Sequence, residues 1–328
     1  MDNSRSIKRF SPLALLIGIP VVLAGGAMFL FKTASRLYDG TLRRGENRMV
    51  KLPIVTESQE HAIMKADIEF RAKVQRWAET APNAEHRIIS HDGLSLCATA
   101  YTRESPDWAV VVHGYAGRGM QMTEAAKGFY DMGYNVLLPD CRGHGKSEGD
   151  YIGMGWHDRM DIINWAQRIT EWDSGGRIVL YGLSMGAAAI MMASGETLPG
   201  NVKCLIEDCG YTSVTEEFSY HLKHSLKIPK FPILNTVDLM CRRHAGYKLK
   251  EASALEQIKK CRLPILFIHG GKDYFVPTEM VYRLYEAADC EKELFIVPDA
   301  GHGVSGNISR KSYWEKIESF TRRCFDRI

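Results

Sequence analysis

The sequence lacks the cysteine patterns that stabilise small secreted proteins or hold zinc. Its eight cysteines include no C-x-x-C pair, and none of them clusters with histidine at zinc-ligand spacing. Several lie in apolar runs, such as Cys204 in VKCLIEDCG, where a free thiol packs as a small hydrophobic side chain. We therefore expect free, buried thiols rather than a disulfide framework, which mildly favours a reducing environment.

A strong net charge is also missing, because 42 Lys and Arg residues are balanced by 39 Asp and Glu residues. The basic residues are spread along the chain and form no motif that reads RNA or DNA, so we expect no nucleic-acid partner. Internal repeats and low-complexity segments are absent as well. The hydrophobic content of 45% is sufficient for a packed core and excludes wholesale disorder.

One long uncharged run is present near the start of the chain. Residues 12–31 read PLALLIGIPVVLAGGAMFLF, a length that crosses a hydrocarbon core of about 30 Å. The run ends in bulky residues without a small-residue cleavage site, which argues against a cleaved signal peptide. Its uniform apolarity argues against a buried helix of the fold. We interpret it as a single-span membrane anchor, and basic residues on both flanks leave its orientation open.

The rest of the chain divides into two parts. Residues 32–84 are polar with apolar side chains at roughly helical spacing, which predicts a helical linker that packs on the following domain. Residues 85–328 open with a hairpin and then alternate short apolar strands with helices, which predicts a mostly parallel, eight-stranded α/β sheet with helices on both faces. The expected strands are residues 86–90, 94–102, 108–113, 134–139, 177–182, 202–207, 263–269 and 292–297.

A stretch without a clear strand, residues 213–262, separates two consecutive strands of this pattern. Insertions of this length in compact domains are usually functional, so we expect a small helical cap over the site. Its basic residues form either a solvated surface or a contact for anionic lipid or an acidic substrate group. They are His221, Lys223, His224, Lys227, Lys230, Arg242, Arg243 and His244.

The segment Gly182-Leu183-Ser184-Met185-Gly186 forms a G-x-S-x-G motif between an expected strand and an expected helix. A serine in such a tight turn adopts a strained backbone, for which neighbouring glycines leave room. The turn raises the serine Oγ above the sheet edge, and the helix directs its first N–H groups at the same place. We predict that Ser184 is a nucleophile.

A serine hydroxyl needs a base within hydrogen-bond reach, and that base needs an orienting acid. His302 in PDAGHGV follows the last expected strand, and Asp273 in HGGKDYFVP follows the strand before it. Both should therefore emerge at the sheet edge that carries Ser184. We expect His302 to be the base and Asp273 the acid. Asp208, after an earlier strand, is the competing acid, and His269 is the competing base, although it ends an apolar strand.

An oxyanion intermediate requires two N–H donors. The residue after the nucleophile, Met185, should provide one, and Tyr115 in the loop HGYAGRG should provide the other. We interpret His113, which begins this loop, as structural. The loop DCRGHGKS, residues 140–147, has neither phosphate-binding nor dinucleotide-binding spacing, so we expect a structural loop with an ion-paired Arg142.

Together, HGYAGRG, DCRGHGKSEG, GLSMGAA, HGGKDYFVP and GHG resemble the α/β-hydrolase superfamily. The most similar branch comprises the prolyl-oligopeptidase-related and Bem46-like hydrolases, which include membrane-anchored bacterial proteins. The resemblance covers residues 85–328 and implies an α/β-hydrolase fold. It also implies Ser184, Asp273 and His302 as a catalytic triad, with Tyr115 and Met185 as oxyanion donors.

These features predict a serine hydrolase that cleaves the ester of a small acyl substrate through an acyl-enzyme, without a metal or organic cofactor. A peptidase or amidase acting on short substrates would use the same triad, as would an acyltransferase. A non-catalytic membrane-bound binding protein would normally have lost a triad member, and none is lost here.

Overall fold

The computed structural model describes residues 12–45 and 57–326, and for residues 12–25, 27 and 57–67 it describes the backbone alone. Its centre is an eight-stranded sheet with the order β1-β2-β4-β3-β5-β6-β7-β8. Strand β2 is antiparallel to both of its neighbours, and all later pairs are parallel. The structure therefore confirms the predicted α/β-hydrolase fold class.

The strands lie close to their expected positions. The largest difference is in β1, which begins directly after Pro82 rather than at His86. The strands are β1 Asn83–Ile89, β2 Ser95–Tyr101, β3 Asp107–Val112, β4 Asn135–Pro139, β5 Arg177–Leu183, β6 Val202–Asp208, β7 Ile265–Gly270 and β8 Lys292–Val297.

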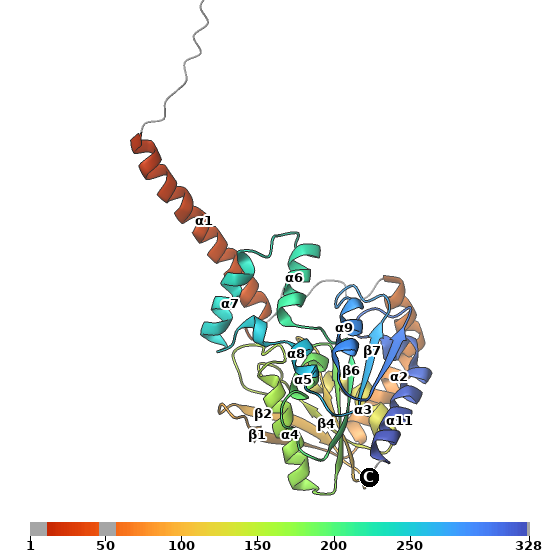
Figure 1. Ribbon diagram of the computed structural model, residues 1–328. Helices are drawn as coiled ribbons and strands as arrows, with labels where there is room; N and C mark the ends of the chain where they lie inside the picture. Colours follow the sequence, from red (N-terminus) through yellow and green to blue (C-terminus); the bar gives the residue numbers. More distant parts are fainter. Residues whose placement is uncertain (1–11, 46–56, 327–328) are drawn as a thin grey trace, which may run out of the picture.

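Helices cover both faces of the sheet (Figure 1). One face packs against α3 (Thr123–Asp131) and α11 (Arg310–Phe325). The other packs against α4 (Asp158–Trp172), α5 (Met185–Ala193), α8 (Ala254–Ile258) and α9 (Glu279–Ala287).

Strand β3 shows why the central strands are apolar throughout. Its Val110 and Val112 enter the core under α4 and α5, whereas Ala109 and Val111 enter the core under α3 and α11. Because successive side chains of a strand point to opposite faces, a sheet covered on both faces needs apolar residues at every position.

Two helices of the β6–β7 connection stand over the carboxyl ends of the strands (Figure 1). They are α6 (Val214–His224) and α7 (Ile233–His244), and a short turn, η3 (Leu249–Glu251), leads from them to α8. Helix α6 begins at Ser213, whose side chain accepts a hydrogen bond from the Glu216 N–H. Phe218 of α6 and Val237 of α7 are buried in the same hydrophobic cluster.

Helix α1 (Pro12–Thr41) packs its C-terminal part against α7 (Figure 1). Ala34, Leu37 and Tyr38 are buried there, at the spacing of one helix face.

The anchor predicted over residues 12–31 falls in this helix, where the side chains of residues 12–25 and 27 lie outside the described part. Among the helices of residues 12–45 and 57–326, none combines the length and apolarity required to cross a membrane. The anchor stays a prediction.

Helix α2 (Glu57–Thr80) lies outside α3, on the same side of the sheet (Figure 1). Trp77 stacks on Tyr101 of β2, with ring centroids 4.6 Å apart, and contacts Tyr130 of α3 at 5.2 Å. These aromatic contacts fix the end of α2 to the domain.

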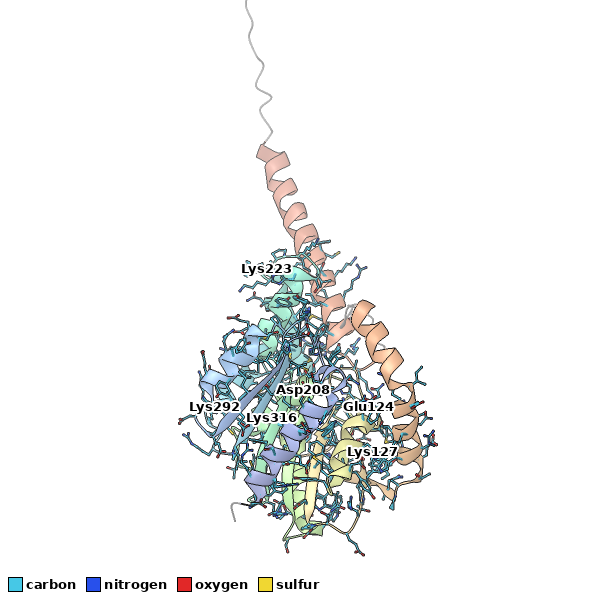
Figure 2. All side chains as sticks on the ribbon, turned by 90° about the vertical axis from the view of Figure 1, so that its right-hand side faces the viewer. Glu124, Lys127, Asp208, Lys223, Lys292 and Lys316 are labelled. Atoms are coloured by element: carbon cyan, nitrogen blue, oxygen red, sulfur yellow. The ribbon has the colours of Figure 1, made fainter. Side chains whose placement is uncertain are left out.

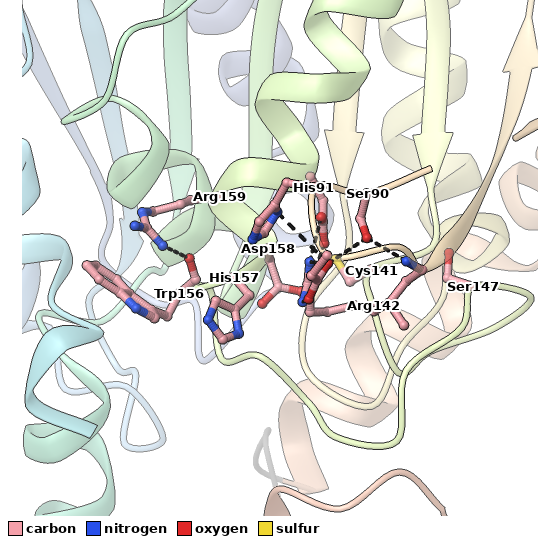
Figure 3. Close-up of polar contacts among 12 residues, drawn as sticks. Ser90, His91, Cys141, Arg142, Ser147, Trp156, His157, Asp158 and Arg159 are labelled. Carbon is pink, nitrogen blue, oxygen red and sulfur yellow. Dashed lines mark hydrogen bonds and ion pairs between the residues drawn. The ribbon is translucent and has the colours of Figure 1, made fainter. Parts of the chain in front are cut away.

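Arg142, in the loop after β4, is completely buried. Figure 3 shows the polar contacts around it. Its guanidinium donates two hydrogen bonds of 2.7 Å to Asp161 of α4. It donates two more, of 2.7 and 3.1 Å, to Asp92 in the β1–β2 turn. A further bond of 3.1 Å reaches the Tyr151 hydroxyl. One side chain thus joins the hairpin, the loop and a helix, which confirms the ion pairing expected for Arg142.

We predict that Arg142→Met lowers the free energy of unfolding by about 3–5 kcal/mol, because it leaves the buried Asp161 carboxylate without its partner. Urea unfolding measures the change. The control is Lys146→Met, whose ion pair with Glu85 is exposed, with 68% and 38% of the two side chains accessible. It should leave the unfolding midpoint unchanged. Equal effects of the two substitutions would contradict the structural role of Arg142.

Candidate active site

Ser184 lies directly after β5 and forms the N-cap of α5. Its φ of 56° and ψ of −114° are unfavourable for a residue with a Cβ atom, so the surrounding structure must hold the turn. The Ser184 N–H donates a hydrogen bond of 2.8 Å to the Asp208 carbonyl at the end of β6. This bond fixes the predicted nucleophile to the neighbouring strand.

Two glycines allow the turn to form. A Cβ atom on Gly182 would lie 2.3 Å from the Gly186 carbonyl oxygen. A Cβ atom on Gly186 would lie 2.3 Å from the Val112 carbonyl oxygen at the end of β3. Both positions therefore require glycine, which is the steric reason for the motif.

The structure brings Ser184, His302 and Asp273 together. The Ser184 Oγ lies 2.8 Å from His302 Nε2, and His302 Nδ1 lies 2.7 Å from Asp273 Oδ2. With Asp273 ionised, Nδ1–H donates to the carboxylate, and Nε2 is free to accept the serine proton. Less than a tenth of each of the three residues is exposed. They come from three loops, each following a parallel strand at the same sheet edge.

The Asp273 carboxylate has further donors. Its Oδ1 accepts hydrogen bonds of 2.9 Å from the backbone N–H groups of Phe275 and Val276. Burial raises the pKa of Asp273, but His302 and His269 outweigh it and hold the pKa at about 2. Asp273 is therefore ionised near neutral pH.

His269, the competing base, lies in β7 and is completely buried. Its Nε2 is 3.0 Å from the Val276 carbonyl oxygen and 3.3 Å from Asp273 Oδ2. The ring thus braces the loop that carries Asp273, as expected for a residue that packs at the end of a strand.

Asp208, the competing acid, has a different partner. Its Oδ2 accepts a hydrogen bond of 2.8 Å from the Tyr313 hydroxyl of α11, which lies 2.9 Å from the Tyr181 hydroxyl. Figure 2 shows Asp208 inside the domain, behind α11. Burial raises the pKa of Asp208 to about 6, because one phenol hydroxyl only partly replaces water. His302 therefore pairs with Asp273 rather than with Asp208.

The two predicted oxyanion donors flank the nucleophile. Met185 is the first residue of α5, and Tyr115 follows Gly114, where a Cβ atom would lie 3.4 Å from the Ser184 Cβ. Within residues 12–45 and 57–326, no acceptor is found for the N–H of Met185 or of Tyr115. Both groups are thus able to bind a developing oxyanion.

His113 supports this loop. Its Nε2 accepts a hydrogen bond of 3.0 Å from the Cys141 N–H, so Nδ1 carries the proton and donates to the Gly114 carbonyl oxygen at 2.7 Å. Burial lowers the pKa of His113 to about 3, which keeps the ring neutral. This arrangement confirms the structural interpretation of His113.

The donor atoms of one further group, Cys209, Asp273 and His302, lie within 4.8 Å of one another. The Asp273 and His302 atoms are already bonded to each other. Burial raises the pKa of the Cys209 thiol well above its usual value, which disfavours the thiolate that a metal requires. The chemistry of this donor set does not fit a metal ion.

A mainly apolar cavity opens above Ser184, between the sheet edge, α6 and the end of α1. The Tyr115 hydroxyl donates a hydrogen bond of 2.6 Å to the Thr41 carbonyl oxygen at the end of α1. The lining residues are Leu37, Thr41, Tyr115, Met154, Ser184, Met185, Tyr211, Glu217, Phe218, His221, Leu222, Ser225, Leu226, Phe275 and Val276.

Sequence patterns do not indicate that α1 or Glu217 reaches this cavity. For α1, the available signal was the spacing of Ala34, Leu37 and Tyr38, which matches one helix face. His221, one of the basic residues predicted on the cap, lies in the wall of the cavity. Lys223, from the same set, lies at the end of α6 away from the sheet (Figure 2).

We predict that Gly186→Ala abolishes labelling of Ser184 by a fluorophosphonate, because the added methyl group collides with the Val112 carbonyl oxygen and shifts the serine turn. The matched control is Gly200→Ala, since a Cβ at Gly200 meets no atom within 4 Å. Gel-based labelling compares the variants, and circular dichroism checks their folding. Wild-type labelling of Gly186→Ala would show that the steric argument is wrong.

Comparisons with known proteins agree with this fold. A sequence model of the prolyl oligopeptidase family matches residues 121–327, more than half of the chain. The solved structure of the Pyrococcus furiosus esterase PF2001 superposes with a TM-score of 0.63 at 21% identity, covering 75% of this chain and 92% of the esterase. At this identity the likeness shows the fold alone.

Three relatives extend the comparison. Uncharacterized protein YqkD of Bacillus subtilis is 28% identical over 66% of this chain and 72% of its own length. Uncharacterized membrane protein YNL320W of Saccharomyces cerevisiae is 25% identical over 58% of this chain and 62% of its own length. Lysophosphatidylserine lipase ABHD12 of Macaca fascicularis is 25% identical over 66% of this chain and 49% of its own length. The chain therefore spans less than two thirds of the length of the last two relatives. The family model that matches residues 121–327 shows that the chain belongs to the prolyl oligopeptidase family within the α/β-hydrolase superfamily.

Proposed function

We propose that this protein is a serine hydrolase that cleaves a carboxylic ester through an acyl-enzyme. The observation that carries the proposal is the hydrogen-bonded chain from Ser184 Oγ through His302 to Asp273, with contacts of 2.8 and 2.7 Å. Nucleophile, base and orienting acid are thus in contact in the order that acyl transfer requires.

In the proposed reaction, Ser184 Oγ attacks the ester carbonyl while His302 Nε2 takes its proton. The N–H groups of Tyr115 and Met185 bind the oxyanion of the tetrahedral intermediate. His302 then gives the proton to the departing alcohol, which leaves an acyl group on Ser184. Water, deprotonated by His302, then attacks the acyl carbon. The bond between that carbon and Ser184 Oγ breaks, His302 returns the proton to Oγ, and the acid leaves. Asp273 stays ionised and stabilises the charged imidazole ring.

The cavity supports an apolar acyl group as the substrate. Phe218 and Leu222 of α6 line it together with Leu226, which follows the helix, and so do Leu37 of α1 and Met154. Burying methylene groups against such a wall contributes about 0.8 kcal/mol for each group. The lipase name of one relative and the esterase name of one structural neighbour are consistent with this substrate class.

A peptidase or amidase acting on short substrates is the second candidate, because the family match over residues 121–327 is to prolyl oligopeptidases. The same triad would attack an amide carbonyl, and His302 would protonate the leaving amine. The acyltransferase alternative also uses this triad, and an added alcohol or amine acceptor would reveal it.

We further propose that residues 12–31 anchor the protein to a membrane. The uncharged run and the membrane protein named among the relatives support this proposal. Because the same helix continues to Thr41 in the cavity wall, an anchor there would hold the cavity near the lipid. An apolar acyl substrate could then enter without crossing water.

The first test is labelling with a fluorophosphonate, which reacts with activated serines. We expect the wild type to be labelled and Ser184→Ala to remain unlabelled, because the alanine has no hydroxyl to attack the phosphorus. A series of p-nitrophenyl esters of increasing chain length, beside an aminoacyl anilide, then separates esterase from amidase. Equal labelling of wild type and Ser184→Ala would rule out the proposed nucleophile.

The second test separates the two acids. Asp273→Asn should lower kcat by about a thousandfold or more, because the amide no longer holds His302 in the required tautomer. Asp208→Asn is the matched control, since its carboxylate bonds Tyr313 rather than His302. It should retain most of the activity. A larger loss in Asp208→Asn than in Asp273→Asn would transfer the acid role to Asp208.

A further inference from the structure

The side of α6 that faces the cavity carries two different stripes. Glu217, His221 and Ser225 follow one another at intervals of four residues and form a polar stripe. Phe218 and Leu222 occupy the next positions and form an apolar stripe, and Leu226, just after the end of the helix, also lines the cavity. Residues four apart lie above one another on a helix, so the two stripes run side by side along the cavity wall.

The polar stripe is connected by hydrogen bonds. Glu217 Oε1 lies 2.9 Å from His221 Nε2, and His221 Nδ1 lies 3.1 Å from the Ser225 Oγ. The His221 ring packs on Phe275 at 4.6 Å, and Phe275 packs on His302 at 4.9 Å. The stripe is therefore fixed in place one aromatic ring away from the catalytic base.

Glu217 has an unused acceptor. Only 4% of the residue is exposed, and its Oε2 has no hydrogen-bond partner within the described ranges 12–45 and 57–326. A buried acceptor without a partner costs about 1–3 kcal/mol. Among the buried side-chain atoms of residues 12–45 and 57–326 that have no partner, this is the one whose residue lines the cavity. Burial raises the pKa of Glu217, and the hydrogen bond with His221 opposes this change. A donor supplied by a ligand would relieve the cost.

This inference depends on the ester-hydrolase function proposed above. We propose that Glu217 is a specificity-determining residue whose Oε2 accepts a hydrogen bond from a hydroxyl or ammonium group on the alcohol part of the substrate. The preferred substrate is then an amphipathic ester with one apolar acyl chain and a small alcohol that carries a donor. The chain lies along Phe218 and Leu222, and the alcohol lies along Glu217 and His221.

A site built to bond a donor discriminates strongly against an analogue that lacks it, because the buried acceptor is again left unpaired. Three octanoate esters test this directly: the 2-hydroxyethyl ester, the 2-(dimethylammonio)ethyl ester and the propyl ester. They share one acyl chain and differ in the donor. We expect kcat/KM of the wild type for a donor-bearing ester to exceed that for the propyl ester by about tenfold or more.

Substitution of Glu217 identifies the acceptor. Glu217→Leu should lower the preference for both donor-bearing esters to near unity. Glu217→Gln keeps a carbonyl acceptor but loses the negative charge, so it should reduce the preference for the ammonium ester more than that for the hydroxyl ester. The two variants together show whether the group recognised is a hydroxyl or an ammonium.

Glu216→Gln is the matched control, because Glu216 is on the same turn of α6 and its carboxylate bonds Arg283 at 2.8 and 3.0 Å. It should keep the wild-type preferences. The inference is wrong if the wild type treats the three esters within about twofold of one another, or if Glu217→Leu keeps the wild-type preference. It is also wrong if Glu216→Gln loses that preference to the same extent.

Fluorophosphonate labelling and thermal melting monitor folding in every sample. If Glu217→Leu does not fold, the preferences of Glu217→Gln decide, since this variant nearly preserves the side-chain shape. A wild type that is labelled at Ser184 but hydrolyses none of the esters would overturn the substrate class while the triad stands. A wild type that is neither labelled nor active would overturn the proposed function itself.

Discussion

The close contact between the start of α5 and the end of β3 is the constraint on which the site depends. At Gly186, no side-chain atom fits between the helix and the Val112 carbonyl oxygen. This contact sets where α5 begins. Ser184, the residue directly before the helix, is thereby held in its strained conformation. The loop with Gly114 and Tyr115 follows β3 directly, so the same contact also positions a proposed oxyanion donor. The same backbone contact thus determines both the packing of α5 on β3 and the geometry of the site.

The two buried carboxylates near His302 show how local hydrogen bonding divides similar residues. Asp208 ends β6 and Asp273 follows β7, so their places in the fold are nearly equivalent. Asp273 accepts two backbone N–H bonds and lies against two imidazole rings, which hold its pKa at about 2. Asp208 receives one bond from Tyr313, and burial raises its pKa to about 6. The number and kind of donors, rather than the strand position, separate the pKa values of the two acids.

The sequence predicted those features that depend on local patterns. The apolar runs of β3 and β5 reveal a sheet covered on both faces, and the glycines around Ser184 reveal a turn that only they permit. His302 could be assigned from chain order and strand position. The acid remained open between Asp273 and Asp208, because the loop N–H donors and the Tyr313 hydroxyl that separate them come from the tertiary fold.

The residues that line the cavity could not be predicted from such local patterns. Glu217 and His221 look like ordinary polar residues of an amphipathic helix, and only the placement of α6 over the sheet edge turns them toward Ser184. Similarly, the apolar spacing of Leu37 and Tyr38 shows that α1 has a buried face but not which surface that face meets.

The bond between the Tyr115 hydroxyl and the Thr41 carbonyl oxygen has a consequence for how such enzymes diverge. Tyr115 contributes its ring to the cavity and its backbone to the loop with the proposed oxyanion donor, while Leu37 and Thr41 come from the segment before the α/β domain. The N-terminal segment therefore forms part of the cavity and cannot be exchanged without changing the cavity wall. A chimera that receives the N-terminal helix of a relative would inherit part of that relative's substrate preference, and the two portions of the chain must change together.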